Sequence, residues 1–411
     1  MNPWPMLIAD LRAMRWTALV VMALIAVAVA IGVGIGAQER GLRQASARAA
    51  DDFPLLIGAP GSQTQLVMTA AYLQIDAIPL VDGGVLNKLA ADPRVAGVAP
   101  IAFGDIVRGW PVIGTTAPLV TAWGRLRPSE GRVFNAESEA VVGADVALAI
   151  GAEISPSHGV KPHGPAGAET KDEAAHKHEG VVYKVVGRLP WRGTPWDRAI
   201  LVPVETVWET HGLGNGHQAD DGKLGPPFDG KTVPGIPAIV VKPRGVADAY
   251  MLRAAYRQGG TMALFPAEVL VSIYRSVGDV RDVLLVVTAL NNLVVLLAVL
   301  LVAVTLVGLR RQRYAMLRAL GAPRLYVFLV IWLGVAVLIA GGCAAGLALG
   351  WLAALLAAEW IGQATGLHAV ATPGWPELRF VLTLLLAGSA LATLPALLSW
   401  RTPVSTALRD S

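Results

Sequence analysis

The stretch TALVVMALIAVAVAIGVGIGA, residues 17–37, contains no charged residue over its 21 positions. At a rise of ~1.5 Å per residue, a helix of this length is ~31 Å long, enough to cross the hydrocarbon core of a bilayer. A cleavable signal peptide normally has a shorter apolar region of roughly 7–15 residues. We therefore predict a retained membrane span at this position.

The composition also indicates a membrane protein. Hydrophobic residues make up 54% of the 411 residues and charged residues only 16%, outside the usual range of soluble globular proteins. The single cysteine, Cys343, lies in an apolar run, which excludes an internal disulfide and a cysteine-rich metal site. The net charge of +4 is too small to indicate nucleic acid as a partner.

Three further apolar runs follow the first, and no Asp or Glu occurs between Val283 and Ala358. Backbone groups in lipid must be hydrogen-bonded internally, so each run should be a helix. We predict an α-helical membrane protein with four transmembrane helices and a large α+β domain between the first and second spans. The predicted segments are 1–16 (amphipathic helix on the cytoplasmic surface), 17–37 (first span), 38–280 (outer domain), 283–309 (second span), 310–324 (cytoplasmic loop), 325–350 (third span), 351–378 (outer loop), 379–399 (fourth span) and 400–411 (cytoplasmic tail).

The charges flanking the spans predict the orientation. The segment RRQRYAMLRALGAPR, residues 310–324, carries five arginines and no acid, so by the positive-inside rule it faces the cytoplasm. Four spans then place both termini inside, in agreement with Arg12, Arg15, Arg401 and Arg409. Three arginines on the other side disagree, namely Arg40, Arg43 and Arg48, but long domains translocate largely regardless of their charge.

The stretch GPPFDGKT, residues 225–232, matches the phosphate-loop pattern G-x-x-x-x-G-K-[ST]. A phosphate loop needs a strand before it and a helix after it. Pro234 and Pro237 forbid a helix here, and the predicted orientation places the stretch outside the cytoplasm. We interpret it as a chance match, so the chain has no nucleotide site of its own.

The outer domain mixes strand-like and helical patterns. Short β-like runs separated by Gly- and Pro-rich turns recur at 94–107, 140–148, 181–189, 198–208 and 236–242. The stretches GVLNKLAAD, from Gly84, and DAYMLRAAYRQ, from Asp248, are helical in pattern. Residues 266–285 predict either a continuous helix leading into the second span or an amphipathic helix packed on the domain.

Several motifs together resemble one family. These are RRQRYAMLRALGAPRLYVFLVIWLGVAVLIAGGCAAGLALGWL (310–352), the ending PALLSWRTPVSTALRD (395–410) and the opening WPMLIADLRAMRWTALVVMALIAVAVAIGVG (4–34). In the outer domain, VVGADVALAIG (141–151) adds to the likeness. The chain resembles the FtsX-like permeases, the MacB and LolC/LolE type of ABC transporter subunit, over nearly its whole length.

The resemblance implies a mechanism and its partners. Two permease copies would form a homodimer in the inner membrane, with the MacB-like domain in the periplasm and a separate cytoplasmic ABC ATPase supplying ATP hydrolysis. The chain would be no enzyme itself, and a periplasmic adaptor or cargo-binding protein would be a further partner. The alternative is a non-transporting regulator that acts by mechanotransmission on a periplasmic enzyme or adaptor.

The arginine-rich loop suits a coupling role. Tyr314, Leu317 and Leu320 are spaced as an apolar stripe on a helix, which Gly321 and Pro323 then end. An apolar stripe surrounded by arginines can dock into a groove of the ATPase. The alternative is that the arginines only fix topology and contact anionic lipid. The predicted coupling residues are Arg310, Arg311, Arg313, Tyr314, Leu317, Arg318 and Leu320.

Small and polar residues within the spans predict helix packing. Gly342, Gly346 and Gly350 share one helix face, where small residues allow close backbone approach within one subunit or at a dimer seam. Asn291 and Asn292 lie in the second span and are expected to hydrogen-bond between helices. In the N-terminal helix, apolar residues share a face suited to the membrane surface, namely Trp4, Leu7, Ile8, Leu11 and Met14.

Four histidines lie in an insertion of the outer domain, residues 155–180, that departs from the family pattern. They are interspersed with acids, and imidazole and carboxylate are good ligands for Zn²⁺. The alternative is a solvated insertion that binds no metal. His211 and His217 form a second small group that could lie near the first. The predicted zinc ligands are His158, His163, His176 and His178.

Overall fold

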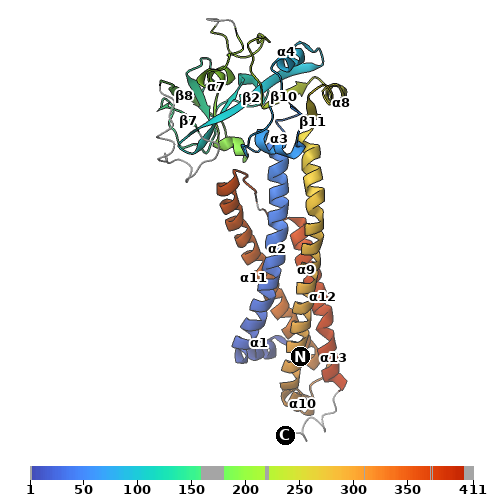
Figure 1. Cartoon of the computed structure of the whole chain (residues 1–411). Coiled ribbons are helices and arrows are strands. Elements are labelled where there is room, and N and C mark those ends of the chain that lie inside the picture. The colour runs from blue at the N-terminus through green and yellow to red at the C-terminus, as the bar shows by residue number, and fades with distance from the viewer. Residues whose placement is uncertain are drawn as a thin grey trace. The chain divides into compact units, whose positions relative to one another are not determined.

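The computed structural model describes residues 2–158, 180–217, 222–309, 311–370, 372 and 374–401 (Figure 1). The chain divides into two compact units. The helical unit consists of Met1–Leu42, Val277–Trp360 and Ala369–Ser411. The sheet unit consists of Arg43–Ser276 together with the short segment Ile361–His368.

Long helices dominate the helical unit. Among the described residues, three helices are long and apolar enough to cross a membrane: Arg15–Ala50, Arg324–Thr365 and Trp375–Leu397. They correspond to the first, third and fourth predicted spans, whereas the second span stays a prediction. The helices are α1 (Trp4–Ala13), α2 (Arg15–Ala50), α9 (Pro266–Leu309), α10 (Arg311–Ala319), α11 (Arg324–Thr365), α12 (Trp375–Leu391) and α13 (Thr393–Arg401).

Helix α9 answers the question left open at residues 266–285. It runs without a break from Pro266 to Leu309, as the continuous-helix alternative expects. Its first turn also packs on the sheet unit, because Val269 and Leu270 belong to one of that unit's apolar cores. In the same helix, the buried Oδ1 of Asn292 has no hydrogen-bond partner among the described residues. The predicted interhelical bond of Asn292 is therefore not seen at this oxygen among the described residues, and the prediction stays open.

The core of the helical unit forms where α2 contacts α11. Val21, Ile25 and Val29 of α2 pack with Ile339 and Cys343 of α11. This contact is close because one face of α11 consists of glycines. A Cβ at Gly342 would lie 2.7 Å from the Cβ of Ile25, one at Gly346 2.6 Å from Ala26 O, and one at Gly350 2.7 Å from Ala30 O. The glycine face is thus occupied within the chain, which leaves no room there for a second copy.

An ion pair joins α2 to the start of α12. The Arg40 guanidinium donates to the carboxylate of Glu377, which is buried, and also to Thr372 O. Glu377 in turn accepts from the backbone N–H of Gly374 at 2.9 Å and so caps α12. Arg40 was one of the arginines that disagreed with the predicted orientation, and here its charge is neutralised by a partner.

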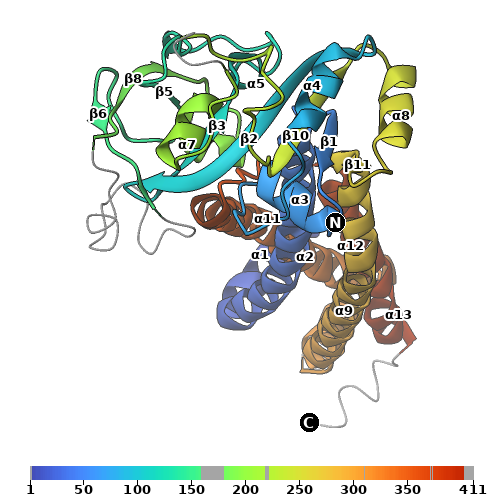
Figure 2. The ribbon, with the colours of Figure 1, turned by 45° about the horizontal axis from the view of Figure 1, so that its top comes forward.

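The sheet unit is built on one mixed sheet in the order β11-β1-β10-β2-β3-β9-β5-β8-β4, with β6 added to β8 and β7 to β2. Figure 2 shows β2, the longest strand, between β10 and β3. The pairs β3–β9 and β5–β8 are parallel, and the others are antiparallel. The strands are β1 (Leu55–Gly58), β2 (Val95–Val107), β3 (Trp110–Thr115), β4 (Glu130–Gly131), β5 (Glu139–Val142), β6 (Glu153–Ile154), β7 (Ser157–His158), β8 (Tyr183–Arg188), β9 (Ile200–Pro203), β10 (Ala238–Pro243) and β11 (Met262–Leu264).

Helices accompany the sheet, which makes the unit an α+β domain as predicted. One predicted strand run, 198–208, proves to be half helix: β9 ends at Pro203 and α7 begins at Val204. The reason is that the apolar residues Val204, Val207 and Trp208 have the i, i+3, i+4 spacing of one helix face and join the same apolar core. The helices are α3 (Gln63–Ala70), α4 (Gly84–Ala91), α5 (Ala117–Val120), the 3₁₀ helix η1 (Pro195–Arg198), α7 (Val204–Thr210) and α8 (Val246–Ala255).

The glycine face yields a first test. We expect Gly346→Ala to lower the free energy of unfolding by about 1–3 kcal/mol, because the added methyl overpacks the contact with α2. Gly34→Ala is the matched control, since its Cβ would meet only Gly350 O at an ordinary 3.5 Å. Thermal unfolding of the purified chain in detergent measures both. Equal midpoints for the two variants would contradict the close packing.

Candidate functional site

The site begins where α11 ends. Although α11 starts in the helical unit, its last residues and the turn after them, Ile361–His368, belong to the sheet unit. The helix stops at Gly366, which has φ +72° and whose N–H donates to Gly362 O at 2.8 Å. A positive φ favours glycine, so this is a typical C-terminal glycine cap. We call Ile361–His368 the docked segment.

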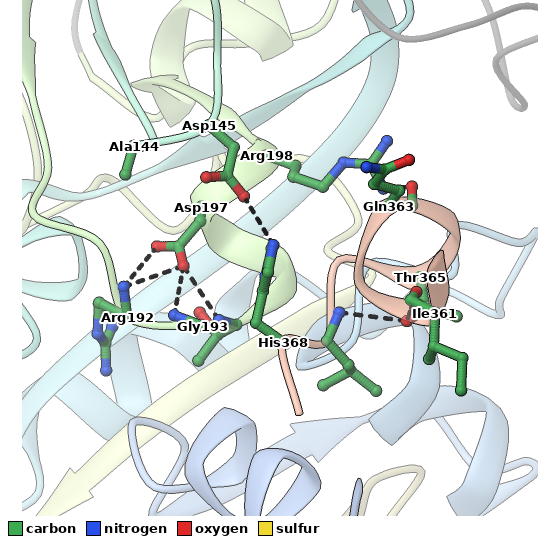
Figure 3. A network of polar contacts seen from close by, with 12 residues as sticks. Ala144, Asp145, Arg192, Gly193, Asp197, Arg198, Ile361, Gln363, Thr365 and His368 are labelled. Carbon is green, nitrogen blue, oxygen red and sulfur yellow. Dashed lines mark hydrogen bonds and ion pairs between the residues drawn. The ribbon is translucent and has the colours of Figure 1, made fainter. Parts of the chain in front are cut away.

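The loop that receives the docked segment is folded around one carboxylate (Figure 3). Asp197 is buried and accepts hydrogen bonds from the N–H groups of Arg192 at 3.0 Å, Gly193 at 2.6 Å and Thr194 at 3.1 Å. Burial raises the pKa of Asp197 above its ordinary value, and these three hydrogen bonds oppose that rise. The three N–H bonds fix the backbone that faces the docked segment.

His368 is held from several directions. Its N–H donates to Gly193 O at 3.3 Å, and its carbonyl accepts from Arg48 Nη2 at 3.0 Å. Its Nε2 lies 3.7 Å from the carboxylate of Asp145, and its ring makes an edge contact with Trp191 at 5.7 Å between centroids. Residues more than 170 positions apart are therefore brought together around one side chain.

Arg198 holds the helix end itself. Its Nη1 donates to Gln363 O at 2.8 Å, within the last turn of α11. Carbonyls there lack helical partners and carry the negative end of the helix dipole, so a cation is favourable. The Arg198 guanidinium also lies 5.4 Å from the ring centroid of Trp110, and burial lowers the pKa of Arg198. A Cβ at Gly366 would lie 3.1 Å from Pro195 Cα, so the fit is close.

The predicted coupling loop forms α10 and a tight turn. The N–H of Gly321 donates to Arg318 O and that of Ala322 to Leu317 O, with Gly321 at φ +96°. This is a Schellman motif, and Pro323 follows it. The short turn then leads directly into α11.

The apolar surface of α10 differs from the predicted stripe. Leu320 is 85% exposed and Met316 54% exposed, four positions apart on one face. Tyr314 instead packs against a small apolar core that includes Val327 and Ile331. Tyr314 is thus half-buried, and the docking role of the stripe stays a prediction. Arg313 is exposed, Leu317 and Arg318 are half-buried, and Arg310 and the side chain of Arg311 lie outside the described residues.

The histidines are placed only in part. The backbone of His158 pairs with Asp105 across β7 and β2. His211 Nε2 lies 3.6 Å from the buried carboxylate of Asp105, and His217 Nε2 lies 3.4 Å from the buried carboxylate of Glu205. Among the described residues, no group of three His, Cys, Asp or Glu could hold a metal ion. Zinc binding stays a prediction, and the remaining predicted ligands lie outside the described residues, namely His163, His176 and His178.

The phosphate-loop match has no phosphate-binding geometry. The N–H of Gly225, its first glycine, donates to the carboxylate of Glu205 at 2.5 Å. A phosphate site would instead turn its amides toward an anion from outside the chain. The described residues directly after Thr232, 233–237, form no helix and lead into β10.

Sequence reasoning missed the docked segment and its receptors, because it treated 351–378 as an outer loop. Two local signals existed. Thr194 and Asp197 have the spacing of a capping box, which predicts an ordered helix start. Gly366 follows a long apolar run and predicts a helix end. Neither signal says that the two meet.

This architecture defines a class of protein. It is a membrane protein in which a mixed α+β domain is inserted between long helices. Residues 285–404 match the family described as FtsX-like permease C-terminal. The predicted resemblance is confirmed there: this part of the chain is similar to the FtsX-like permeases, a family of ABC transporter membrane subunits. No curated protein sequence matches the chain.

Two solved structures are similar to the chain at low scores. One is the periplasmic region of MacB from Actinobacillus actinomycetemcomitans, at 10% identity and a TM-score of 0.32, covering 54% of this chain and 94% of that one. The other is the extracellular domain of the noncanonic ABC-type transporter YknZ from Gram-positive bacteria, at 10% identity and a TM-score of 0.29, covering 51% and 98%. The resemblance to the FtsX-like permeases therefore rests on the sequence match at residues 285–404 alone.

A second test concerns the docked segment. Gly366→Ala should lower the midpoint of thermal unfolding and speed hydrogen exchange in 361–368, because it adds both backbone strain at positive φ and a clash with Pro195. Gly212→Ala is the matched control, since Gly212 has φ +70° but open space around its Cβ. The control should show the strain alone, of about 1 kcal/mol. Equal exchange in 361–368 for both variants would refute the close fit.

A third test concerns zinc. If the predicted site exists, calorimetric titration of the full chain at neutral pH should show Zn²⁺ binding that weakens in a His176→Ala, His178→Ala double variant. The binding should weaken because each imidazole supplies one metal bond. His217→Ala is the control and should leave the affinity unchanged, because His217 lies beside Glu205, whereas the predicted ligand His158 pairs with Asp105. An absence of Zn²⁺ uptake, or an unaltered affinity in the double variant, would rule the site out.

Proposed function

We propose that the chain is the permease subunit of an ABC transporter of the FtsX/MacB type. In this proposal, ATP hydrolysis by a separate cytoplasmic ATPase moves the sheet unit in the periplasm, for export or extraction of a substrate. Two copies form a homodimer in the inner membrane, with both termini cytoplasmic. The family match at residues 285–404 supports the permease role.

One observation carries the mechanical part of the proposal. A single helix, α11, runs for 42 residues without a break, which corresponds to ~63 Å. It begins directly after α10 and the Gly321 turn, and its last residues lie in the sheet unit. A continuous helix is stiff along its axis. A displacement of α10 would therefore reach the loop around Asp197.

The cytoplasmic contact would be made by α10. Met316 and Leu320 are exposed apolar side chains on a helix that also carries Arg313 and Arg318. Exposed apolar residues surrounded by charge fit a partner's groove. The alternative function, regulation of a periplasmic enzyme or adaptor without transport, would use the same route, and the protein that co-purifies on the periplasmic side decides between them.

The test is capture of the ATPase. The tagged chain, cross-linked in its native cells, should co-purify with an ABC ATPase identified by mass spectrometry. The double variant Met316→Glu, Leu320→Glu should capture about tenfold less, because burying the new charges in an apolar groove is unfavourable. The matched control is Leu213→Glu, which introduces the same charged side chain at an exposed leucine of the sheet unit.

Two outcomes would count against the proposal. One is that no ABC ATPase is recovered with the unaltered chain. The other is that the double variant captures as much ATPase as the Leu213→Glu control does. Co-purification of the chain with a cargo-binding protein supports a transport function. Co-purification with a cell-wall hydrolase supports the alternative, a regulator that does not transport.

A further inference from the structure

The sheet unit contains a cavity of about 600 Å³ beside the docked segment. It lies between α3, the turn that joins β2 to β3, the helix η1 and the last residues of α11. Cavities of ~300–1,000 Å³ are the size that encloses a drug-sized ligand. The structure thus offers space for a small organic molecule and not only for water.

The walls of the cavity combine apolar and polar side chains. Met68 and Leu73 come from α3 and the turn after it, Ile106 and Trp110 from the β2–β3 hairpin, and Pro195 from η1. Tyr72 also lines the cavity, but its hydroxyl donates to Ser46 O at 2.7 Å and is already used. A hydrocarbon or aromatic body would be desolvated favourably against such walls.

Two charged side chains line the cavity, Asp76 and Arg198. The Asp76 carboxylate is occupied: it accepts from Gln65 Nε2 at 3.1 Å and from the N–H of Ala77 at 2.9 Å. Arg198 forms no ion pair with any described residue. It donates to Gln363 O and lies over the Trp110 ring, and Asp145 acts on it only at longer range while facing His368.

Half-buried guanidinium groups without a carboxylate partner favour an anionic ligand. Burial in apolar surroundings strengthens the attraction, and the planar fork of N–H donors matches a carboxylate or phosphate. Five donors are present in a guanidinium, and only one is used by Gln363. The remaining donors leave room for two parallel bonds to an anion.

We propose that this cavity binds an amphipathic organic anion, with its carboxylate or phosphate at Arg198 and its apolar body against Met68, Leu73 and Trp110. Ala364 and Thr365 of the docked segment line the same cavity, so a bound ligand contacts the end of α11 directly. The inference deepens the proposed function. Only the role of the ligand, as cargo or as a signal for the transporter, rests on that function. Binding itself requires no ATPase.

The experiment is calorimetric titration of the full chain in lipid nanodiscs, with empty nanodiscs as the reference. The probes are octanoate, octyl phosphate, neutral octanol and inorganic phosphate. We expect saturable binding of octanoate or octyl phosphate, with the tighter of the two identifying the acid group. Octanol and inorganic phosphate should each bind at least about tenfold more weakly, since each lacks one half of the recognition.

Variants separate the charge from the cavity. Arg198→Gln should weaken binding of the anion about 10-fold to 100-fold and leave octanol unaffected. Arg257→Gln removes an exposed arginine that is not part of the cavity and should change nothing. Ala364→Trp fills the cavity from an exposed position and keeps Arg198, so it should abolish binding even if Arg198→Gln disturbs folding.

The proposal is overturned if no probe binds saturably, if octanol binds as tightly as the anions, or if Ala364→Trp binds like the unaltered chain. Failure of the transport proposal looks different. In that case the anion still binds in nanodiscs, but no ABC ATPase is captured through α10.

Discussion

The close approach of α2 and α11 depends on three glycines of α11, which have no side chain. At Gly342, Gly346 and Gly350 the backbone of α11 lies so near α2 that a methyl group would overlap its carbonyl oxygens and side chains. Membrane helices gain little from the hydrophobic effect, so van der Waals contact at short distance is what holds such a pair together. Both helices also extend into the sheet unit, α2 from Arg43 onward and α11 from Ile361 onward.

At its other end, α11 is held by hydrogen bonds to the polar groups of its last turn and of the residues that follow. Arg198 meets the carbonyl of the last turn, and His368 is fixed by hydrogen bonds through both its N–H and its carbonyl. The receiving loop is itself rigid because Asp197 gathers three N–H groups. In the proposed function, a helix end anchored in this way transmits a displacement, whereas a frayed end would absorb it. The cavity of the sheet unit is lined both by Arg198 and by Ala364 and Thr365 of the docked segment.

The sequence predicted the large features because they arise from local patterns. Apolar runs predicted three helices that are long and apolar enough to cross a membrane. Alternating or helical spacing predicted five strands and two helices of the outer domain, namely β2, β5, β8, β9, β10, α4 and α8. Failures occurred where tertiary contacts decide. Tyr314 has the spacing of an exposed stripe, but it is half-buried against residues of α11 and α13. Residues 204–208 look like a strand because Val and Trp are common in strands, although their apolar residues have helical spacing. The docked segment could not be predicted, because the partners of Gln363 and His368 lie more than 160 positions away in the chain.

The carboxylate at the centre of the receiving loop bears on acid tolerance. Since burial places the pKa of Asp197 above the ordinary aspartate value, the folded chain binds this proton more tightly than the unfolded chain does. Between those two pKa values, stability from this group is greater at lower pH and declines as the pH rises. Acidification would therefore not lower the stability of the folded chain through Asp197.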